Sequence, residues 1–176
     1  MWKQLSSKVI FKHPRLTLVE DDVLLPDGTK TKYLKYQSNG GGAATIICQR
    51  SDGKILFQKE YSYPPNQQLL QLPGGAIDSG EDPEVAANRE LSEEMGYRGN
   101  DLKLIGSSLI NNRRSDLRVF IFLTTSFTKT QTKRESTEEG MEELWFSESE
   151  VEKMISKGQI INCHTLAAWA VFKSRK

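Results

Sequence analysis

The chain has 176 residues, of which 37% are hydrophobic and 27% charged, and its formal net charge is +1. These values suit one globular domain with at most a small appendage, and they exclude disordered and disulfide-stapled classes. The balanced charge argues against an obligatory nucleic-acid or membrane-surface partner, and no apolar run is long enough to cross a bilayer. With two cysteines and no secretory leader, we expect a cytoplasmic protein with reduced thiols.

The first forty residues are rich in strand-forming side chains. Apolar runs at 9–11 and 16–25 are followed by a Pro-Asp-Gly turn at 26–28 and by a return strand at 31–37. This alternation of strands and a tight turn predicts a small antiparallel β-sheet.

A run of three glycines at 40–42 separates this segment from the rest of the chain. Consecutive glycines are unfavourable inside a strand, so we expect a hinge or boundary there. The sequence therefore predicts two units, an N-terminal β-sheet subdomain of residues 1–39 and a main domain of residues 40–176.

The main domain contains both strand and helix signals. Strands are expected at 43–49, 54–61, 69–72, 102–109, 118–127 and 141–146. One helix begins after the N-cap residue Asp82 and ends at Gly96, a second begins at a capping box at 147–150, and a third covers 165–172. Residues 128–139 are polar and have no apolar anchor, so we expect a mobile loop. This mixed order predicts an α+β fold or an α/β sandwich.

Three carboxylates lie close together on the first of these helices. At about 100° per residue, Glu90 and Glu94 are one turn apart on one face, and Glu93 lies beside them. Clustered carboxylates repel one another, and a hard divalent cation such as Mg²⁺ removes that cost because it prefers oxygen ligands. The alternative is an ordinary solvated acidic face, with Leu91 and Met95 packing on the adjoining side.

The residues around this helix favour the metal-binding interpretation. Gly74 and Gly75 allow the backbone to come close to a ligand, and a loop carbonyl can complete an octahedral metal site. Arg89 is placed to pair with a carboxylate such as Glu81 and so to hold the loop against the helix.

The segment 75–97, GAIDSGEDPEVAANRELSEEMGY, resembles the Nudix box. That motif requires fixed residue types at fixed spacing, and every requirement is met, by Gly75, Glu81, Arg89, Glu90, Glu93, Glu94 and Gly96. The last position, Tyr97, is aromatic where an aliphatic residue is more common. A complete match of this length is far more specific than a lone glycine fingerprint.

The resemblance implies a Nudix α/β/α sandwich with a mixed β-sheet, and an enzyme that hydrolyses a diphosphate. In the family pattern, Glu90 and Glu94 ligate Mg²⁺, with Mn²⁺ as an alternative, helped by Glu93 and the main-chain carbonyl of Gly74. The cations neutralise the diphosphate oxygens and activate a water, which attacks one phosphorus and releases a nucleoside monophosphate. Arg89 belongs to the same catalytic segment.

The resemblance leaves the general base open. In the ADP-ribose branch of the family, the base tends to be a glutamate from a late loop, for which this chain offers Glu135, Glu138 and Glu139. Glu93, within the box, is the competing candidate. For each loop glutamate, simple solvation is the alternative.

The N-terminal segment resembles that of ADP-ribose and nucleoside-diphosphate-sugar pyrophosphatases, in which the N-terminal sheet is often exchanged between the subunits of a homodimer. The expected substrate is therefore ADP-ribose or another nucleoside-diphosphate sugar, cleaved to a nucleoside monophosphate and a sugar phosphate. The chain departs from that branch at Ser62, at Gln71 and at 111–114, so strict specificity for ADP-ribose is not expected.

Substrate contacts are expected from residues outside the box. Arg113 and Arg114 suit a phosphate, although plain loop charges are an equal alternative. Tyr63 is a candidate for stacking on a base, although packing within its turn is the alternative.

Two other functions stay open. One is a Nudix enzyme acting on nucleoside triphosphates, dinucleoside polyphosphates or capped RNA ends, and the balanced charge weakens the RNA version. The other is a non-catalytic module that senses a nucleotide. Such modules usually lose box carboxylates or accompany a DNA-binding segment, and neither feature is evident in this sequence.

Overall fold

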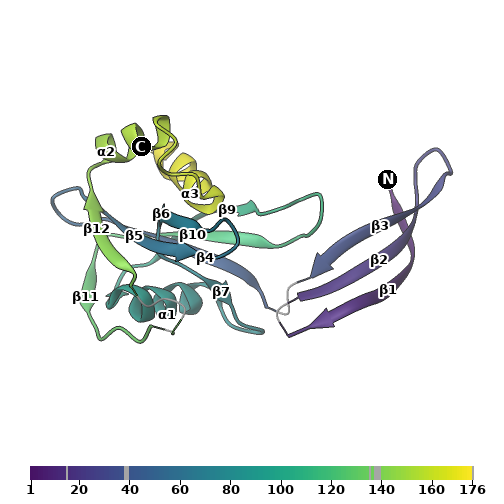
Figure 1. Ribbon diagram of the computed structural model, residues 1–176, viewed down its shortest axis with the longest axis horizontal. Coiled ribbons are helices and arrows are strands. Elements are labelled where there is room, and N and C mark those ends of the chain that lie inside the picture. Colours follow the sequence, from purple (N-terminus) through teal and green to yellow (C-terminus); the bar gives the residue numbers. More distant parts are fainter. Residues whose placement is uncertain (15, 38–39, 135, 137–139, 176) are drawn as a thin grey trace.

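The computed structural model describes residues 1–14, 16–37, 40–134, 136 and 140–175. A three-stranded sheet stands at one end of the molecule, and a layered body of strands and helices forms the other end (Figure 1). The predicted α+β class, a mixed sheet between helical layers with a small antiparallel sheet before it, is confirmed. No helix within these ranges is long and apolar enough to cross a membrane.

The N-terminal sheet is antiparallel, in the order β1-β2-β3. Its strands are β1 (Lys3–His13), β2 (Leu16–Leu24) and β3 (Lys30–Gln37). β1 is much longer than the apolar run expected at 9–11, because pairing with β2 and not burial sets its length, and all its side chains are exposed. The buried apolar side chains of this sheet, Val19 and Val23, lie on the central strand.

A four-stranded mixed sheet forms the centre of the body. β4 and β10 are parallel, and the two outer pairs are antiparallel. The order across the sheet is β7 (Ala76–Ile77), β4 (Gly42–Cys48), β10 (Arg118–Thr124) and β9 (Lys103–Leu109). Side chains of β4 enter two cores, since Ala44 and Ile46 pack in one and Ile47 in the other. A strand covered on both faces explains the continuous apolar run in this part of the sequence.

In the described parts of the chain, helices cover both faces of the body (Figure 1). α1 (Pro83–Met95) contributes to one core, and α2 (Glu148–Ser156) and α3 (Cys163–Lys173) contribute to the other. The predicted caps are confirmed, because the side chain of Asp82 accepts a backbone N–H at the start of α1, and Gly96 ends that helix with φ 68°. The predicted capping box of α2 is also present.

Two further sheets complete the body. One has the order β12 (Glu142–Phe146), β5 (Ile55–Ser62) and β6 (Gln67–Gln71), and the other pairs β11 (Phe127–Lys129) with β8 (Tyr97–Gly99). The single strand expected at 118–127 is wrong, because the Asp101 carboxylate accepts the N–H groups of Thr125 and Ser126 and interrupts it. The loop expected at 128–139 is also wrong at its start, which belongs to β11.

The glycine run is firmly attached to the body. The N–H of Gly41 donates to Ile77 at 2.9 Å, and Gly42 is the first residue of β4, with φ 109°. A Cβ at Gly42 would lie 2.3 Å from the carbonyl oxygen of Arg118, so glycine allows β4 and β10 to approach. Gly41 and Gly42 are therefore part of the body, and the division into residues 1–39 and 40–176 stays a prediction.

Candidate active site

The most deeply placed of the predicted carboxylates is Glu94, with 4% of its surface exposed. Its two oxygens are held separately, by Gln58 Nε2 at 3.1 Å and by the N–H of Gly74 at 2.9 Å. Burial raises the pKa of Glu94 to about 8 against the effect of these two hydrogen bonds, and the charges of Glu90 and Glu60 raise it further. A carboxylate that is costly to ionise alone is one that a bound cation would stabilise.

Arg89 connects the other carboxylates of this segment. Its Nε and Nη2 each donate to Glu81 at 3.0 Å, as the sequence predicted, and this pair lowers the pKa of Glu81. Its Nη1 donates to Glu90 at 2.8 Å and to Glu93 at 3.2 Å, and its Nη2 also reaches the carbonyl of Ala76 at 2.9 Å. One guanidinium therefore fixes the loop before α1 against two of the helix carboxylates.

The segment Pro73–Gly75, called here the glycine loop, runs along β4. The N–H of Ile46 donates to the carbonyl of Pro73 at 3.0 Å, and the N–H of Ala44 donates to that of Gly75 at 2.9 Å. The carbonyl of Gly74, between them, accepts no hydrogen bond from the described residues. Its oxygen is therefore available to a ligand, as expected for a main-chain metal ligand.

Both glycines of the loop are required by close contacts. Gly74 has φ 143°, and a Cβ there would lie 2.1 Å from the carbonyl oxygen of Ala44. A Cβ at Gly75 would lie 2.5 Å from the carboxyl carbon of Glu90. Any larger residue would displace either the loop or the carboxylate, so the glycines bring backbone and helix carboxylates into one place.

These oxygens fit a hard divalent cation in chemical type, since all are carboxylate or carbonyl oxygens. Within the described ranges, however, no three acidic, histidine or cysteine side chains converge as a metal centre. Arg89 Nη1 holds both Glu90 and Glu93, and the two oxygens of Glu94 accept from Gln58 and Gly74. Glu93 has a side chain that is 38% exposed, so it has room to turn away from Arg89 toward a cation.

A cavity of about 360 Å³, called here the loop cavity, opens beside the glycine loop. Its polar side chains are those of Thr45, Glu60, Ser62, Gln71, Asn162 and His164. Gln71 Nε2 donates to Glu60 at 2.5 Å, and Asn162 Nδ2 donates to Gln71 Oε1 at 2.8 Å. Burial lowers the pKa of His164, which favours its neutral form. The carboxylates of α1 therefore stand next to a polar cavity of ligand size.

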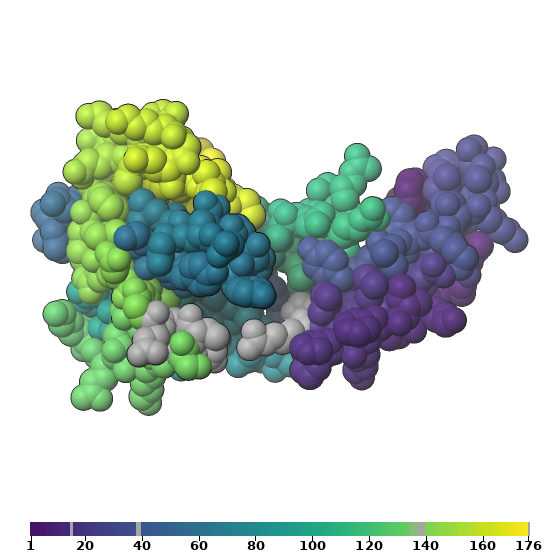
Figure 2. Space-filling model, in the orientation of Figure 1, coloured from purple at the N-terminus to yellow at the C-terminus, as the bar shows by residue number. Residues whose placement is uncertain are grey.

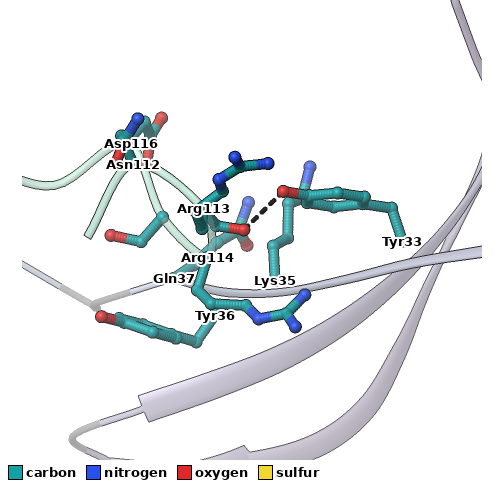
Figure 3. A pocket seen from close by; sticks show the side chains of 9 residues that line it. Tyr33, Lys35, Tyr36, Gln37, Asn112, Arg113, Arg114 and Asp116 are labelled. Atoms are coloured by element: carbon teal, nitrogen blue, oxygen red, sulfur yellow. Dashed lines mark hydrogen bonds between the residues drawn. The ribbon is translucent and has the colours of Figure 1, made fainter.

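A second cavity, of about 270 Å³ and called here the sheet cavity, lies between β3 and the β9–β10 turn (Figure 3). The Tyr33 hydroxyl donates to the carbonyl of Arg113, and the N–H of Tyr36 donates to that of Arg114 at 2.8 Å. Arg114 Nη1 donates to the carbonyl of Leu34 at 3.3 Å, with its guanidinium 5.9 Å from the Tyr33 ring centre. These contacts join the turn to the N-terminal sheet. In the space-filling view, the chain around this turn lies against that sheet (Figure 2).

The structure divides the predicted site residues into separate groups. Those brought together at the end of α1 are Gly74, Arg89, Glu90, Glu93 and Glu94. Arg113 and Arg114 lie instead at the sheet cavity, and Tyr63, which is 83% exposed, lies on the turn between β5 and β6. The candidate bases Glu135, Glu138 and Glu139 lie outside the described residues.

Sequence reasoning missed three side chains near the carboxylates, Gln58, Glu60 and Asn162. Gln58 is fully buried and follows three fully buried apolar residues of β5. A polar residue continuing an apolar strand was the signal that could have identified it. Glu60 and Asn162 gave no such signal, because their relation to the glycine loop depends on chain segments that are distant in sequence.

The fold and the carboxylate cluster together define a hydrolase of diphosphate bonds. The chain belongs to the Nudix family, because the NUDIX domain model matches residues 41–162. The model for the nucleoside diphosphate sugar hydrolase N-terminal domain matches residues 2–33. The predicted family and the predicted enzyme class are thus confirmed.

Named relatives extend over most of the chain. An ADP-ribose pyrophosphatase of Bacillus subtilis (strain 168) is 30% identical over 144 residues, which cover 81% of this chain and 76% of the relative. A protein of the same name from Mycobacterium tuberculosis is 25% identical over 171 residues, which cover 94% and 80%. The crystal structure of an ADP compounds hydrolase superposes with a TM-score of 0.86 at 18% identity, covering 98% of this chain and 92% of that one. This last likeness shows the fold.

Proposed function

We propose that the protein hydrolyses the diphosphate bond of ADP-ribose or another nucleoside-diphosphate sugar, giving a nucleoside monophosphate and a sugar phosphate. The observation that carries this proposal is the placement of Glu90, Glu93 and Glu94 beside the glycine loop, organised by Arg89. The N-terminal family match over residues 2–33 supports the sugar-linked branch over triphosphates or capped RNA.

The residues suited to hold a divalent cation are Glu90, Glu93, Glu94 and the carbonyl of Gly74. We propose Mg²⁺, with Mn²⁺ as the alternative, because hard oxygen donors of this kind prefer such ions. When bound, the cation supplies neutralisation of the diphosphate charge and activation of water. Arg89 fixes the position of the loop and of Glu90, and Glu93 would turn away from Arg89 to complete the set of donor atoms.

Among the residues that the structure describes, Glu93 is our candidate for the general base. Glu138 and Glu139 are the alternatives predicted from the sequence. The side chain of Glu93 is more exposed than those of Glu81 and Glu90, and its contact with Arg89 is the longer one, at 3.2 Å. A carboxylate in this role takes one proton from water as the water oxygen bonds to phosphorus. The bond from that phosphorus to the bridging oxygen breaks, and the second phosphate leaves.

The two arginines of the β9–β10 turn have different proposed roles. Arg114 is already bonded to Leu34 and lies near the Tyr33 ring, which supports a role in holding the turn against the N-terminal sheet. The guanidinium of Arg113 has no hydrogen bond or ion pair to the described residues, which supports a direct contact with a substrate phosphate. A stacking role for Tyr63 is the least supported, because its ring stands in solvent.

We further propose that residues 1–39 form a dimerisation subdomain and that residues 40–176 form the catalytic domain of a cytoplasmic homodimer. Apolar side chains of β1, of the start of β2 and of the residue before β1 are exposed, namely those of Trp2, Leu5, Val9, Ile10, Phe11 and Leu16. Exposed apolar surface of this extent is typical of an interaction face. Exchange of the sheet between two subunits would cover it.

The test is hydrolysis of a substrate panel with Mg²⁺, in which each product is identified. The panel contains ADP-ribose, GDP-mannose, UDP-glucose, NADH, dinucleoside polyphosphates and nucleoside triphosphates. Release of a nucleoside monophosphate from a sugar conjugate supports the proposal. Preferential turnover of triphosphates, or binding across the panel with no turnover, contradicts it. A monomeric mass in solution contradicts the dimer.

A further inference from the structure

The loop cavity has a lining that is unusual for a site beside a diphosphate. Among its described lining residues there is one carboxylate, that of Glu60, and no lysine or arginine. Ser62, Gln71 and Asn162 add a hydroxyl group and two amides. Phosphate groups are normally held by cationic side chains or by backbone N–H groups. The lining instead suits a neutral group that donates hydrogen bonds.

The position of the Glu60 carboxylate is set by a chain of hydrogen bonds that begins at α3. Asn162 Oδ1 accepts the N–H of Thr165 at 3.0 Å as the N-cap of that helix, which leaves its amide Nδ2 to donate to Gln71. Gln71 therefore uses its Oε1 as acceptor and must direct its Nε2 to Glu60. Both amide orientations follow from the helix cap, and Glu60 is held as a hydrogen-bond acceptor at the cavity wall.

We propose that the loop cavity binds the sugar of the substrate through its hydroxyl groups, with Glu60 as the specificity-determining acceptor and Gln71 and Asn162 as positioning residues. This inference rests on the proposed function, since it assigns one end of the same substrate. Sugar hydroxyl groups donate hydrogen bonds. An ionised carboxylate is the strongest hydrogen-bond acceptor among the side chains, and it binds a neutral sugar without charge repulsion. The cavity adjoins the glycine loop, so a sugar attached directly to the diphosphate reaches it.

The sheet cavity has a lining of different charge from that of the loop cavity, and this difference would orient the substrate. Its lining includes two tyrosine rings, of Tyr33 and Tyr36, and three cations, of Lys35, Arg113 and Arg114, against one carboxylate, that of Asp116. A lining with this excess of cations suits an aromatic or anionic group, whereas the described lining of the loop cavity has a carboxylate and no lysine or arginine. A triphosphate entering the loop cavity would place phosphate charge against Glu60, which is unfavourable. The two linings therefore favour a substrate whose end near the glycine loop is a neutral polyol.

The first test measures binding of ribose 5-phosphate to the full-length protein by calorimetry and by amide chemical shifts, with inorganic phosphate as the parallel probe. The wild type should bind ribose 5-phosphate at least about tenfold more tightly than phosphate. Glu60→Gln should lose about tenfold in ribose 5-phosphate affinity and nothing in phosphate affinity. Glu142→Gln is the matched control, because Glu142 is an exposed glutamate on the neighbouring strand, and it should behave as the wild type.

The second variant tests the chain of hydrogen bonds without removing the helix cap. Asn162→Ser keeps a capping oxygen and removes the amide that orients Gln71. It should weaken ribose 5-phosphate binding several-fold and raise KM for ADP-ribose, with kcat and the melting temperature nearly unchanged. If Asn162 served fold stability alone, Asn162→Ser would instead lower the melting temperature and would leave both KM and kcat of the folded protein unchanged.

Two results would overturn the inference. One is equal affinity of wild type and folded Glu60→Gln for ribose 5-phosphate. The other is a loss of affinity for Mg²⁺ titrated alone in Glu60→Gln, which would make Glu60 a metal ligand. Because these are binding measurements, they stay informative if the enzyme fails to cleave ADP-ribose, which would instead refute the proposed function.

Discussion

The end of α1 and the N-terminal sheet are built on opposite principles. Around α1, charged groups are bonded to one another, and Arg89 alone makes contacts with three carboxylates. In the N-terminal sheet, all eleven residues of β1 are exposed, including Val9 and Phe11. The first region has its structure completed by contacts within one chain. The second leaves apolar surface that its own chain does not cover, as a region used for association would.

Among variants that keep all the carboxylates of α1, Gly75→Ala should produce the largest effect, and it would break the first region of this comparison. The added Cβ would meet the Glu90 carboxyl group at 2.5 Å and displace it from its place beside Arg89. Misplacement of a catalytic group by about 1 Å costs roughly 100-fold in rate, so kcat should fall by about that factor. Gly53→Ala is a control for backbone strain, since Gly53 has φ 82° but a Cβ there meets nothing within 4 Å, so its kcat should stay at the wild-type value. An unchanged kcat in Gly75→Ala would show that the close packing of loop and helix is unimportant.

The charge on buried Glu94 should make the metal-free protein sensitive to pH. Its pKa rises from 4.5 in the unfolded chain to about 8 in the folded one, so the folded form binds the proton more tightly. Stability should therefore fall as pH rises from 4.5 to 8 and should stay level on either side of that window. Glu94→Gln removes this pH dependence. In that variant Gln58 can turn its amide so that Oε1, which has no partner among the described residues of the wild type, accepts from the new glutamine.

Melting curves in EDTA at pH 5 and pH 8.5 measure this difference. Relative to Glu94→Gln, the wild type should lose on the order of 10 °C between the two pH values. Other titrating groups are common to both proteins and cancel in the comparison. If the melting temperatures of the two proteins changed equally between the two pH values, the raised pKa of Glu94 would be contradicted.

Substitution of exposed apolar residues on β1 would sharpen the comparison from the other side. Val9→Lys with Phe11→Lys should weaken self-association by at least about tenfold, because these side chains are more than half exposed in the single chain. Light scattering across a dilution series measures the dissociation constant. Thr128→Lys, which adds a lysine at an exposed residue of the body, should leave this dissociation constant unchanged. A wild type that is monomeric at all concentrations would refute the association role.

The smallest effects are expected at the turn that joins the two regions. Arg113→Ala should raise KM by a few-fold without lowering the melting temperature, since its guanidinium has no bond to the described residues. Arg114→Ala should instead lower the melting temperature by about 2–4 °C, corresponding to roughly 1 kcal/mol for the lost bond to Leu34 and the contact with Tyr33. Identical behaviour of the two variants would remove the distinction between them.

The same two regions show what the sequence could predict. α1 was predicted in full because its signals are local, from the Asp82 cap to Gly96. The pairing of Arg89 with Glu81 was also predicted, because the two residues are only eight apart in the sequence. The length of β1 was missed because all its side chains are exposed and pairing alone sets its extent. Hydrophobic patterns give no information about a strand of that kind.

The surroundings of the carboxylates were missed for another reason. Gln58 and Glu94 are 36 residues apart in sequence, and Gln71 and Asn162 are 91 residues apart. Neither pair has a local spacing that would indicate contact, and only the packing of β5, β6 and α3 brings them together. The box therefore located the chemistry from sequence, whereas the polar groups proposed to select the substrate required the fold.

The most direct test of the central claim is the rate of ADP-ribose hydrolysis by wild type and Glu94→Gln with saturating Mg²⁺, with products identified by ³¹P NMR. The wild type should release AMP and ribose 5-phosphate, and EDTA should abolish the reaction. Glu94→Gln should fold and melt at least as well as the wild type, yet lose at least about 1,000-fold in kcat. Equal rates in the two proteins would contradict the assignment of diphosphate cleavage to the carboxylates of α1.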